Sequence, residues 1–485
     1  MWRWESRSEG SGRYACSGRR AVWCAADGRR TGLVMPATFT PEEARRIGEQ
    51  VVELPGADAV EVVVMGSTIA LTRFARSQII QNTIQETVRA YIRVAVGRRV
   101  ASASTNQFNA KSIGATADRA LESALKAPDD PEFPGFPSPA EVGAAAPVMR
   151  WDEATASTRA DVRARAIADI LALTQGSEAA GIYETSSHAY SVVSSSGMDC
   201  HDAYTRCVVS CLADIDGATG YHEASSHCRD AIDHETVART AAGKARSGAG
   251  AGDVAPGEYE VVLEPAAVAM LLDYLSYAGF GAKQMIDGES FFSKRIGQRV
   301  AQPSVTVADD VTHPLSVGIG FDFEGVPRKR VAVIERGTAV EPVTDYRTAR
   351  RLGRQPSGHY SGSNEWGPYA SNILMEPGDA TSEQLVAGVD DGLLVTRFHY
   401  VNVLDRPTAL LTGMTRDGLW RIRQGEVAEP VHNLRFTQSV LDALDSECRV
   451  GRDLHAFAAE FGGFGSTVAP SLHVGRWAFT SATSH

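Results

Sequence analysis

The feature that most constrains the fold is an order of helix, β-type runs and helix that occurs twice in the first half of the chain. At Thr40 an N-cap hydroxyl, Pro41 at the first helical position and acidic residues in the first turn predict the start of a helix. Strand-like runs follow, and a helical stretch over 112–126 closes the first unit. A helix over 158–174, further strand-like runs and a helix over 233–246 repeat this order. The runs cover 60–65, 68–74, 78–83 and 87–96 in the first unit, and 181–194, 197–202, 204–213 and 220–228 in the second. Two similar α+β units are therefore expected.

The second half of the chain is β-rich. Segments rich in Pro, Gly or acidic residues, 127–147 and 248–256, are predicted linkers. A strand over 259–263 then leads into a helix over 264–277. Beyond this helix, strand-like runs alternate with turn signals at 322–327, 335–337, 376–379, 405–407 and 424–426. Strands between regularly spaced turns favour a sandwich or a barrel-like domain.

The length and composition agree with more than one domain. A chain of 485 residues that is 43% hydrophobic can bury at least two ordinary cores. The predicted fold is α+β, with an N-terminal α+β domain over 35–250 and a C-terminal β-rich domain over 251–485. Residues 1–34 lack helical or strand periodicity and are predicted to be a disordered extension.

Charge and cysteine content exclude several classes of protein. The net charge of -11 argues against a large nucleic-acid surface, and no apolar run reaches the roughly 18 residues of a membrane span. Seven Cys residues without framework spacing are typical of reduced thiols and predict a cytoplasmic protein. The sequence contains no phosphate loop, dinucleotide fingerprint or Gly-x-Ser-x-Gly elbow, so those chemistries have no support.

Four stretches in the C-terminal half carry a resemblance to a known family. They are Asp391-Gly-Leu-Leu-Val-Thr-Arg-Phe398, Leu411-Thr-Gly-Met-Thr-Arg-Asp-Gly-Leu419, Gly425-Glu-Val and Pro430-Val-His-Asn-Leu-Arg-Phe436. In order and spacing they resemble the TldE (PmbA) signature of the TldD/TldE metallopeptidase family. The same family is matched by Tyr346-Arg-Thr-Ala-Arg-Arg-Leu-Gly353 and Met375-Glu-Pro-Gly-Asp379, and more weakly by Thr72-Arg-Phe-Ala75 and Thr105-Asn106. The resemblance spans about Thr40 to about Ala478.

This resemblance implies that TldD-like and TldE-like chains assemble into a peptidase. The catalytic chain of the family carries HExxxH on a helix just after a strand, and a later Cys completes its zinc site. The matching helix here has Asp273, Tyr274 and Ala278 at the His, Glu and His positions, and 461–472 contains no Cys. A catalytic zinc needs about three protein ligands and a general base. We therefore expect no catalytic residue and no metal or other cofactor in this chain.

The resemblance implies a TldE-like subunit that completes the substrate cleft, with zinc carried by a TldD-like partner in a heterodimer or higher heteromer. The substrates would be peptides or amide-containing metabolite precursors, and the sequence leaves general proteolysis and natural-product maturation equally open. One alternative is a self-sufficient peptidase or amidase. Another is a non-catalytic peptide-binding scaffold.

The self-sufficient alternative could act through metal-free amide chemistry or through a metal at His222-Glu-Ala-Ser-Ser-His227, which is formally an HExxxH. In a helix the two imidazoles would be separated by roughly 140°, and in a strand they would lie on opposite faces. Neither geometry forms a metal site with His222, Glu223 and His227 unaided. An exposed strand is therefore predicted for this segment, with the metal site kept as the alternative.

Other polar residues have a structural and a functional interpretation. Cys207 and Cys211 share one face of a predicted strand and are expected in the core rather than as a redox pair. Asp309 and Asp310, at a strand end, are expected to cap a turn rather than to act as an acid/base pair. The candidate contacts to substrate or partner are His359, Arg416, Asn433 and Arg435. A solvated loop is favoured for the first of these and a structural role for the other three.

Overall fold

The computed structural model describes residues 38–461 and 464–482. The predicted extension over 1–34 lies outside this part of the chain. The expected α+β class is confirmed, since helices accompany three sheets. Within the described residues no helix is both long enough and apolar enough to cross a membrane.

The two N-terminal units join into one antiparallel six-stranded sheet with the order β3-β2-β1-β4-β5-β6. The first unit comprises α1 (Pro41–Glu49), β1 (Ala59–Ala75), β2 (Gln78–Val96), β3 (Arg99–Thr105) and α2 (Ala110–Lys126). The second comprises α5 (Ala160–Leu173), β4 (Glu178–Ser194), β5 (Asp199–Ile215), β6 (Ala218–Ser226) and α6 (His234–Ser247). Two short helices, α3 (Pro139–Val142) and α4 (Glu153–Ala156), lie between the units, and the 3-10 helix η1 (Arg229–Ala231) precedes α6. Both units thus share one element order and meet where β1 pairs with β4.

Local chemistry explains where the first helix starts. The Thr40 backbone N–H donates to Glu43 Oε2 at 2.9 Å, and the Glu43 N–H donates to Thr40 Oγ1 at 3.2 Å. This reciprocal capping box satisfies two backbone donors that lack intrahelical partners. Ala44 and Ile47, one turn apart, are buried in the core between α1, α2 and the sheet. The predicted helix start at Thr40 is confirmed.

The strands are longer than predicted. The runs 60–65 and 68–74 form the single strand β1, although Gly66 and Ser67 interrupt the β-type composition. Gly66 lies opposite Val88 of β2 and Ala189 of β4, so the ladder continues through it on both sides. Pairing with two neighbours outweighs the weak strand preference of one glycine. The runs 78–83 and 87–96 are likewise one strand, β2, because the residues between them pair with β1. The run 197–202 joins 204–213 in β5 through Ala203, which pairs with Ala189 of β4.

The C-terminal region contains a closed sheet. Strand β12 (Asp391–Asp405) pairs with β7 (Gly257–Leu263), which pairs with β19 (Leu472–Ala482); β19 then pairs with β15 (Leu434–Ser439), which pairs with β13 (Leu410–Arg423). Because β13 also pairs with β12, these strands form a ring. Strands β14 (Glu426–Pro430) and β16 (Cys448–Val450) add to β13 and β19. The barrel-like expectation is therefore confirmed for this sheet.

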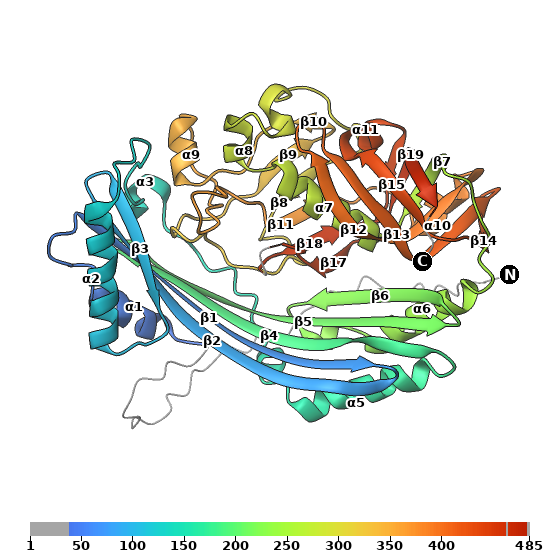
Figure 1. Ribbon diagram of the computed structural model, residues 1–485, viewed down its shortest axis with the longest axis horizontal. Coiled ribbons are helices and arrows are strands. Elements are labelled where there is room, and N and C mark those ends of the chain that lie inside the picture. Colours follow the sequence, from blue (N-terminus) through green and yellow to red (C-terminus); the bar gives the residue numbers. More distant parts are fainter. Residues whose placement is uncertain (1–37, 462–463, 483–485) are drawn as a thin grey trace. The chain divides into compact units, whose positions relative to one another are not determined.

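A second sheet of six strands lies beside the barrel-like sheet. Its order is β10 (Thr338–Ala339), β9 (Val331–Glu335), β8 (Val307–Asp309), β11 (Asn372–Met375), β18 (Ser466–Ala469) and β17 (His455–Ala458). Helix α7 (Pro265–Gly279) follows β7 and packs against β12 of one sheet and β11 and β18 of the other (Figure 1). One large core contains the buried face of α7 and both sheets. The remaining helices are α8 (Ala282–Ile286), η2 (Phe291–Lys294), α9 (Tyr346–Arg351), α10 (Ser382–Ala387) and α11 (Val440–Asp445).

Candidate functional site

Helix α7 carries Asp273, Tyr274 and Ala278, the residues that the sequence comparison aligns with the His, Glu and His of HExxxH. Its strand–helix junction is formed by β7 and by Pro265 at the first helical position. Asp273 is 4% exposed. Its carboxylate accepts a hydrogen bond from the Glu460 backbone N–H at 3.0 Å and another from the Thr467 hydroxyl of β18. Asp273 therefore ties α7 to the second sheet.

The other two positions on α7 hold packing side chains. The Tyr274 ring packs edge-on against Phe461, with ring centroids 5.0 Å apart, and Ala278 is fully buried. The three positions thus supply one carboxylate, already hydrogen-bonded, and no imidazole. In the part of the chain that the structure describes, no three His, Cys, Asp or Glu side chains are grouped to hold a metal ion. These residues do not fit a zinc ion, which needs about three converging ligands.

Burial governs the protonation of Asp273. Removing the carboxyl from water raises its pKa to about 7, against the lowering effect of the hydrogen bonds from Thr467 and Glu460. The neutral acid is thus accessible near neutral pH. A lone buried carboxyl of this kind resembles a general acid in its pKa, but its oxygens are directed at the protein's own groups.

His359 is a buried ion-pair partner, and the solvated-loop interpretation is wrong. It has no exposed surface, and its Nε2 lies 2.9 Å from Asp309 Oδ1 at the end of β8. The other oxygen of Asp309 accepts from the backbone N–H groups of Ser371 at 2.7 Å and Asn372 at 2.8 Å. Burial favours the neutral acid, but His359 and Arg328 outweigh it and lower the pKa of Asp309 to about 2. The flanking Ser and Gly residues gave no sign of this burial, because Asp309 is distant in sequence.

Ser357, His359 and Asp309 have the connectivity of a hydrolase triad, since Ser357 Oγ lies 2.9 Å from His359 Nδ1. The hydroxyl is nevertheless fully engaged: Ser357 Oγ accepts from the Thr344 N–H at 2.7 Å and donates to the Thr344 carbonyl at 3.0 Å. It is also buried, so no substrate carbonyl reaches it. The sequence analysis did not identify this triad, and its geometry is that of a structural network.

Asp310 has the predicted role of a turn cap. Its Oδ1 accepts from the Thr312 N–H at 2.9 Å and from the Thr312 hydroxyl at 2.6 Å. Asp309 and Asp310 therefore point to different partners. They are not an acid/base pair, as expected. The expectation that Asp309 also caps a turn is wrong, because its carboxylate is held by the backbone of Ser371 and Asn372 and lies against His359.

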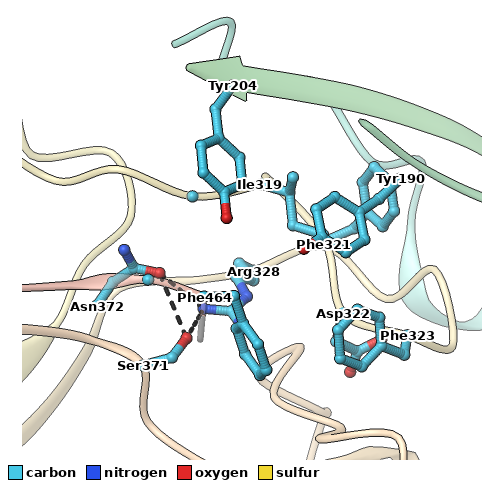
Figure 2. Close-up of a pocket in the computed structure, with 12 residues that line it drawn as sticks. Tyr190, Tyr204, Ile319, Phe321, Asp322, Phe323, Arg328, Ser371, Asn372 and Phe464 are labelled. Atoms are coloured by element: carbon cyan, nitrogen blue, oxygen red, sulfur yellow. Dashed lines mark hydrogen bonds between the residues drawn. The ribbon is translucent and has the colours of Figure 1, made fainter. Parts of the chain in front are cut away.

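A small cavity lies next to the Asp309 network, between the N-terminal sheet and the C-terminal region. Figure 2 shows Tyr190 and Tyr204 of the sheet on one side, and Arg328, Ser371 and Asn372 on the other. Arg328 Nη1 donates to Ser371 Oγ at 2.7 Å and to Asn372 Oδ1 at 2.9 Å. The cavity volume is about 10 Å³, the room of one water molecule, so it is part of the packing and does not accommodate a substrate.

A second buried charge cluster was not anticipated from the sequence. Arg93 of β2 donates to Glu61 Oε1 of β1 at 2.7 Å and approaches Glu324 Oε1 of the C-terminal region at 3.4 Å. Its guanidinium lies 4.9 Å from the ring centroids of both Phe136 and Tyr360. Burial raises the pKa of Glu324 well above its usual range, and it also raises the pKa of Glu61. One arginine thus joins the sheet to the C-terminal region.

The remaining candidate contacts lie together on the barrel-like sheet, apart from His359. Arg416 is on β13, with its Nε 3.7 Å from Asp417 Oδ1, and is partly exposed. Thr415 of β13 donates to Asn433 Oδ1 at 3.0 Å. Arg435 of β15 is exposed and pairs in register with Met414 of β13. The structure therefore brings three of the four candidates together: two lie on the adjoining strands β13 and β15, and Asn433 immediately precedes β15.

His222 to Ser226 lie on edge strand β6, as predicted, and His227 follows its end, but the side chains of this segment are half-buried, not exposed. The reason is that α6 packs on one face and β13 and β17 of the C-terminal region approach the strand. Glu223 accepts from the Tyr221 hydroxyl at 2.5 Å, and Arg397 lies over the Tyr221 ring at 3.8 Å. Burial lowers the pKa of His222 to about 3, helped by Lys244 and His455. His222, Glu223 and His227 are not brought together as ligands.

Cys207 and Cys211 are core residues, as predicted. Both are fully buried on β5 and pack with α5 and α6. Neither forms a disulfide, and burial raises the pKa of each thiol to about 12. A thiol that stays protonated is a poor nucleophile and a poor metal ligand.

Comparison with known families gives matches in both halves of the chain. Residues 256–481 match the PmbA/TldA metallopeptidase C-terminal domain, and residues 60–124 match domain 1 of the same family. Together the matched ranges cover more than half of the chain. The C-terminal match contains β7, α7 and the barrel-like sheet.

Among curated relatives, a metalloprotease of Methanothermobacter thermautotrophicus is 25% identical over 199 residues, covering 41% of this chain and 43% of the relative. A zinc metalloprotease TldD homolog of Saccharolobus solfataricus is 26% identical over 210 residues, covering 41% and 44%. The chain thus spans less than half the length of these relatives. In fold it is similar to TldE of Thermococcus kodakarensis, with a TM-score of 0.80 at 16% identity, over 91% of this chain and 100% of the other.

Proposed function

Because the chain belongs to the PmbA/TldD metallopeptidase family, we propose that it is the subunit without zinc of a heteromeric peptidase of the TldD/TldE type. Zinc is then carried by a TldD-like partner with an intact HExxxH. This chain contributes walls of the substrate cleft and stabilises the partner, and it acts in the cytoplasm.

One observation carries this proposal: Asp273, Tyr274 and Ala278 are built into the core. A carboxylate can bind zinc in place of an imidazole, so Asp273 by itself would still be a possible ligand. Its carboxylate, however, already accepts hydrogen bonds from Thr467 and Glu460. Ala278 has no donor atom, and Tyr274 packs on Phe461. A site with too few ligands cannot fix the open coordination geometry that metal-assisted hydrolysis requires.

The substrates under this proposal are peptides or amide-containing precursors. Extended peptides are commonly bound by addition to a sheet edge. General proteolysis and maturation of a specialised metabolite are equally compatible with such a cleft. A second candidate function, hydrolysis by this chain alone through His222 and His227, has no supporting geometry in β6.

The test compares the chain alone with the chain co-purified with a TldD-like subunit from the same organism. Alone, it should contain well below one zinc per chain by elemental analysis and should hydrolyse no peptide. The two chains together should form a stable complex whose activity is abolished by chelators and by replacing the Glu of the partner's HExxxH. Hydrolysis by this chain alone, unaffected by the partner, would falsify the proposal.

The control variant is His222→Ala in this chain. Loss of a general acid or base costs about 100-fold or more, whereas a strand residue outside the chemistry should leave turnover within about threefold. Near-stoichiometric zinc that disappears in the His222→Ala, His227→Ala double variant would instead favour the self-sufficient alternative.

A further inference from the structure

Arginine side chains gather on the outer face of the barrel-like sheet, where β12, β13 and β15 are neighbours. Arg397 of β12 pairs directly with Arg416 of β13. Arg435 of β15 pairs with Met414, two residues along β13, and is therefore the diagonal neighbour of Arg416. Thr415 is fully buried in the barrel, so the alternation of strand side chains directs Arg416 outward. We call Arg397, Arg416 and Arg435 the arginine patch.

Like charges directly opposite each other on neighbouring strands repel, so the arginine patch needs negative charge. Among the residues that the structure describes, Asp417 alone forms ion pairs with the patch. Arg397 Nε donates to Asp417 Oδ2 at 2.6 Å, and its guanidinium lies over the Tyr221 ring. Arg416 Nε lies 3.7 Å from Asp417 Oδ1, which is too far for a hydrogen bond. Arg416 and Arg435 therefore have no hydrogen-bonded carboxylate in the described part of the chain.

His399 of β12 lies beside the arginine patch and is affected by its charge. Burial lowers the pKa of His399, and the charges of Arg416 and Arg397 lower it further. Asp417 raises this pKa, but by less than the other effects lower it. Glu223 of β6 is near Arg397, but burial raises the pKa of that carboxyl. An excess of positive charge therefore remains on this face, although the whole chain has a net charge of -11.

The backbone next to Arg416 is irregular. Asp417 and Gly418 of β13 lie opposite Thr396 alone, which is a β-bulge. Asp417 has a φ of 56°, in the left-handed region that residues other than glycine rarely adopt. Bulges occur next to functional sites, where they change the direction of a side chain. Here the bulge leaves Asp417 fully buried and Arg416 on the surface.

We infer that Arg416 and Arg435 together bind a carboxylate of a peptide. Its source is either the α-carboxylate at the C-terminal end or the side chain of Asp or Glu. Guanidinium groups bind carboxylates through paired, charge-assisted hydrogen bonds. Diagonal neighbours on adjoining strands are about 7–8 Å apart, so two long side chains reach one carboxylate. A polyanion such as nucleic acid is disfavoured, because the net charge of the chain is -11.

The inference deepens the proposed function and rests on it only for the peptide as the ligand. Carboxylate binding itself requires neither zinc nor a second subunit. A bound carboxylate fixes the position of the peptide along the cleft, so these two arginines select the amide bond that is presented for hydrolysis.

The test is isothermal titration calorimetry of the purified full chain at physiological ionic strength with short, alanine-rich, N-acetylated peptides. One peptide ends in a free carboxylate, a second is amidated, and a third is amidated but contains an Asp. The first or the third should bind at least about tenfold more tightly than the second, since only they supply a charge-assisted hydrogen bond. Whichever of the two binds more tightly identifies the source of the carboxylate.

Variants assign the binding to the two arginines. Arg416→Gln and Arg435→Gln should each weaken binding of the preferred peptide by about tenfold. Both side chains are on the surface, so the fold is retained, which circular dichroism checks. The matched control is Arg423→Gln, because Arg423 is also exposed on β13 but is already paired with Glu429 at 2.7 Å. It should change the affinity by less than about twofold, since salt screens a distant surface charge.

Equal affinity for all three peptides would overturn the inference. So would unchanged affinity in Arg416→Gln and Arg435→Gln, or a loss of the same size in Arg423→Gln. Because every titration uses this chain alone, such a failure leaves the proposal of a zinc-free subunit intact. Conversely, a chain that forms no complex with a TldD-like partner but binds the carboxylate through these arginines refutes only the proposed function.

Discussion

At the scale of single residues, Asp273 of α7 shows what burial does to a carboxyl that is bonded only to the protein's own groups. Its folded pKa of about 7 lies above the ordinary value of 3.8 because of burial. Between these two values the folded protein binds a proton that the unfolded chain releases. The free energy of unfolding therefore falls as pH rises from about 4 to about 7. Above pH 7 the buried carboxyl is ionised and the whole of this destabilisation is present. The pKa shift corresponds to a loss of at most about 4 kcal/mol in the free energy of unfolding.

The first prediction follows from that sign. Asp273→Asn keeps the shape and the acceptor for the Glu460 N–H but cannot ionise. At pH 8 the variant should be more stable than the wild type, by up to about 4 kcal/mol, and the advantage should shrink toward pH 5. Urea unfolding at several pH values measures it. Asp453→Asn, at an exposed carboxylate, is the control and should change stability by less than about 0.5 kcal/mol throughout. An Asp273→Asn effect that does not vary with pH would contradict the assignment.

At the scale of elements, helix α6 packs on β6 and half-buries the segment that contains His222 and His227. Gly220 of β6 lies under the helix: a Cβ at this position would be 2.2 Å from the Ala241 carbonyl oxygen and 2.5 Å from the Ala245 nitrogen. Both atoms belong to the helix backbone and cannot rotate away. The absent side chain therefore permits the close approach of α6.

The second prediction compares two glycines of this helix–strand pair. Gly220→Ala should lower the free energy of unfolding by about 1–3 kcal/mol, as expected for overpacking. Gly243→Ala on α6 should raise it by about 0.5–1 kcal/mol, because a Cβ there has no neighbour within 4 Å and alanine favours a helix. Urea unfolding of both variants checks the opposite signs. A Gly220→Ala protein as stable as the wild type would show that α6 does not approach β6 this closely.

At the scale of the whole molecule, Arg93 connects segments that are far apart in sequence. It bonds Glu61 within the N-terminal sheet, reaches Glu324 in the C-terminal region, and lies between the rings of Phe136 and Tyr360. Removing one member of a buried ion pair leaves the other charge uncompensated, which costs more than the pair itself contributes.

The third prediction is that Arg93→Met lowers the free energy of unfolding by about 3–5 kcal/mol. The matched control is Arg73→Met on β1, an exposed arginine, which should change it by less than about 0.5 kcal/mol. Adding Glu61→Gln to Arg93→Met should recover part of the loss, because the glutamine carries no buried charge. The observation that would refute the role of Arg93 is a variant within 1 kcal/mol of the wild type.

The sequence by itself determined the order of elements, the capped start of α1 and the helix that carries Asp273, Tyr274 and Ala278. These follow from local signals: caps, the spacing of apolar residues and an ordered series of motifs. It also placed Cys207 and Cys211 in the core, since their separation puts both side chains on one face of β5.

The tertiary structure alone decided which strands pair and what is buried. The joining of the two units through β1 and β4, and the closure of the second-half strands between β12 and β13, depend on contacts between residues distant in sequence. His359 has the local sequence of a solvated loop, yet Asp309 brings it into the interior. The half-burial of His222 likewise results from α6 and the C-terminal region. Local sequence fixes backbone preference, whereas pairing and burial depend on the partner that long-range folding supplies.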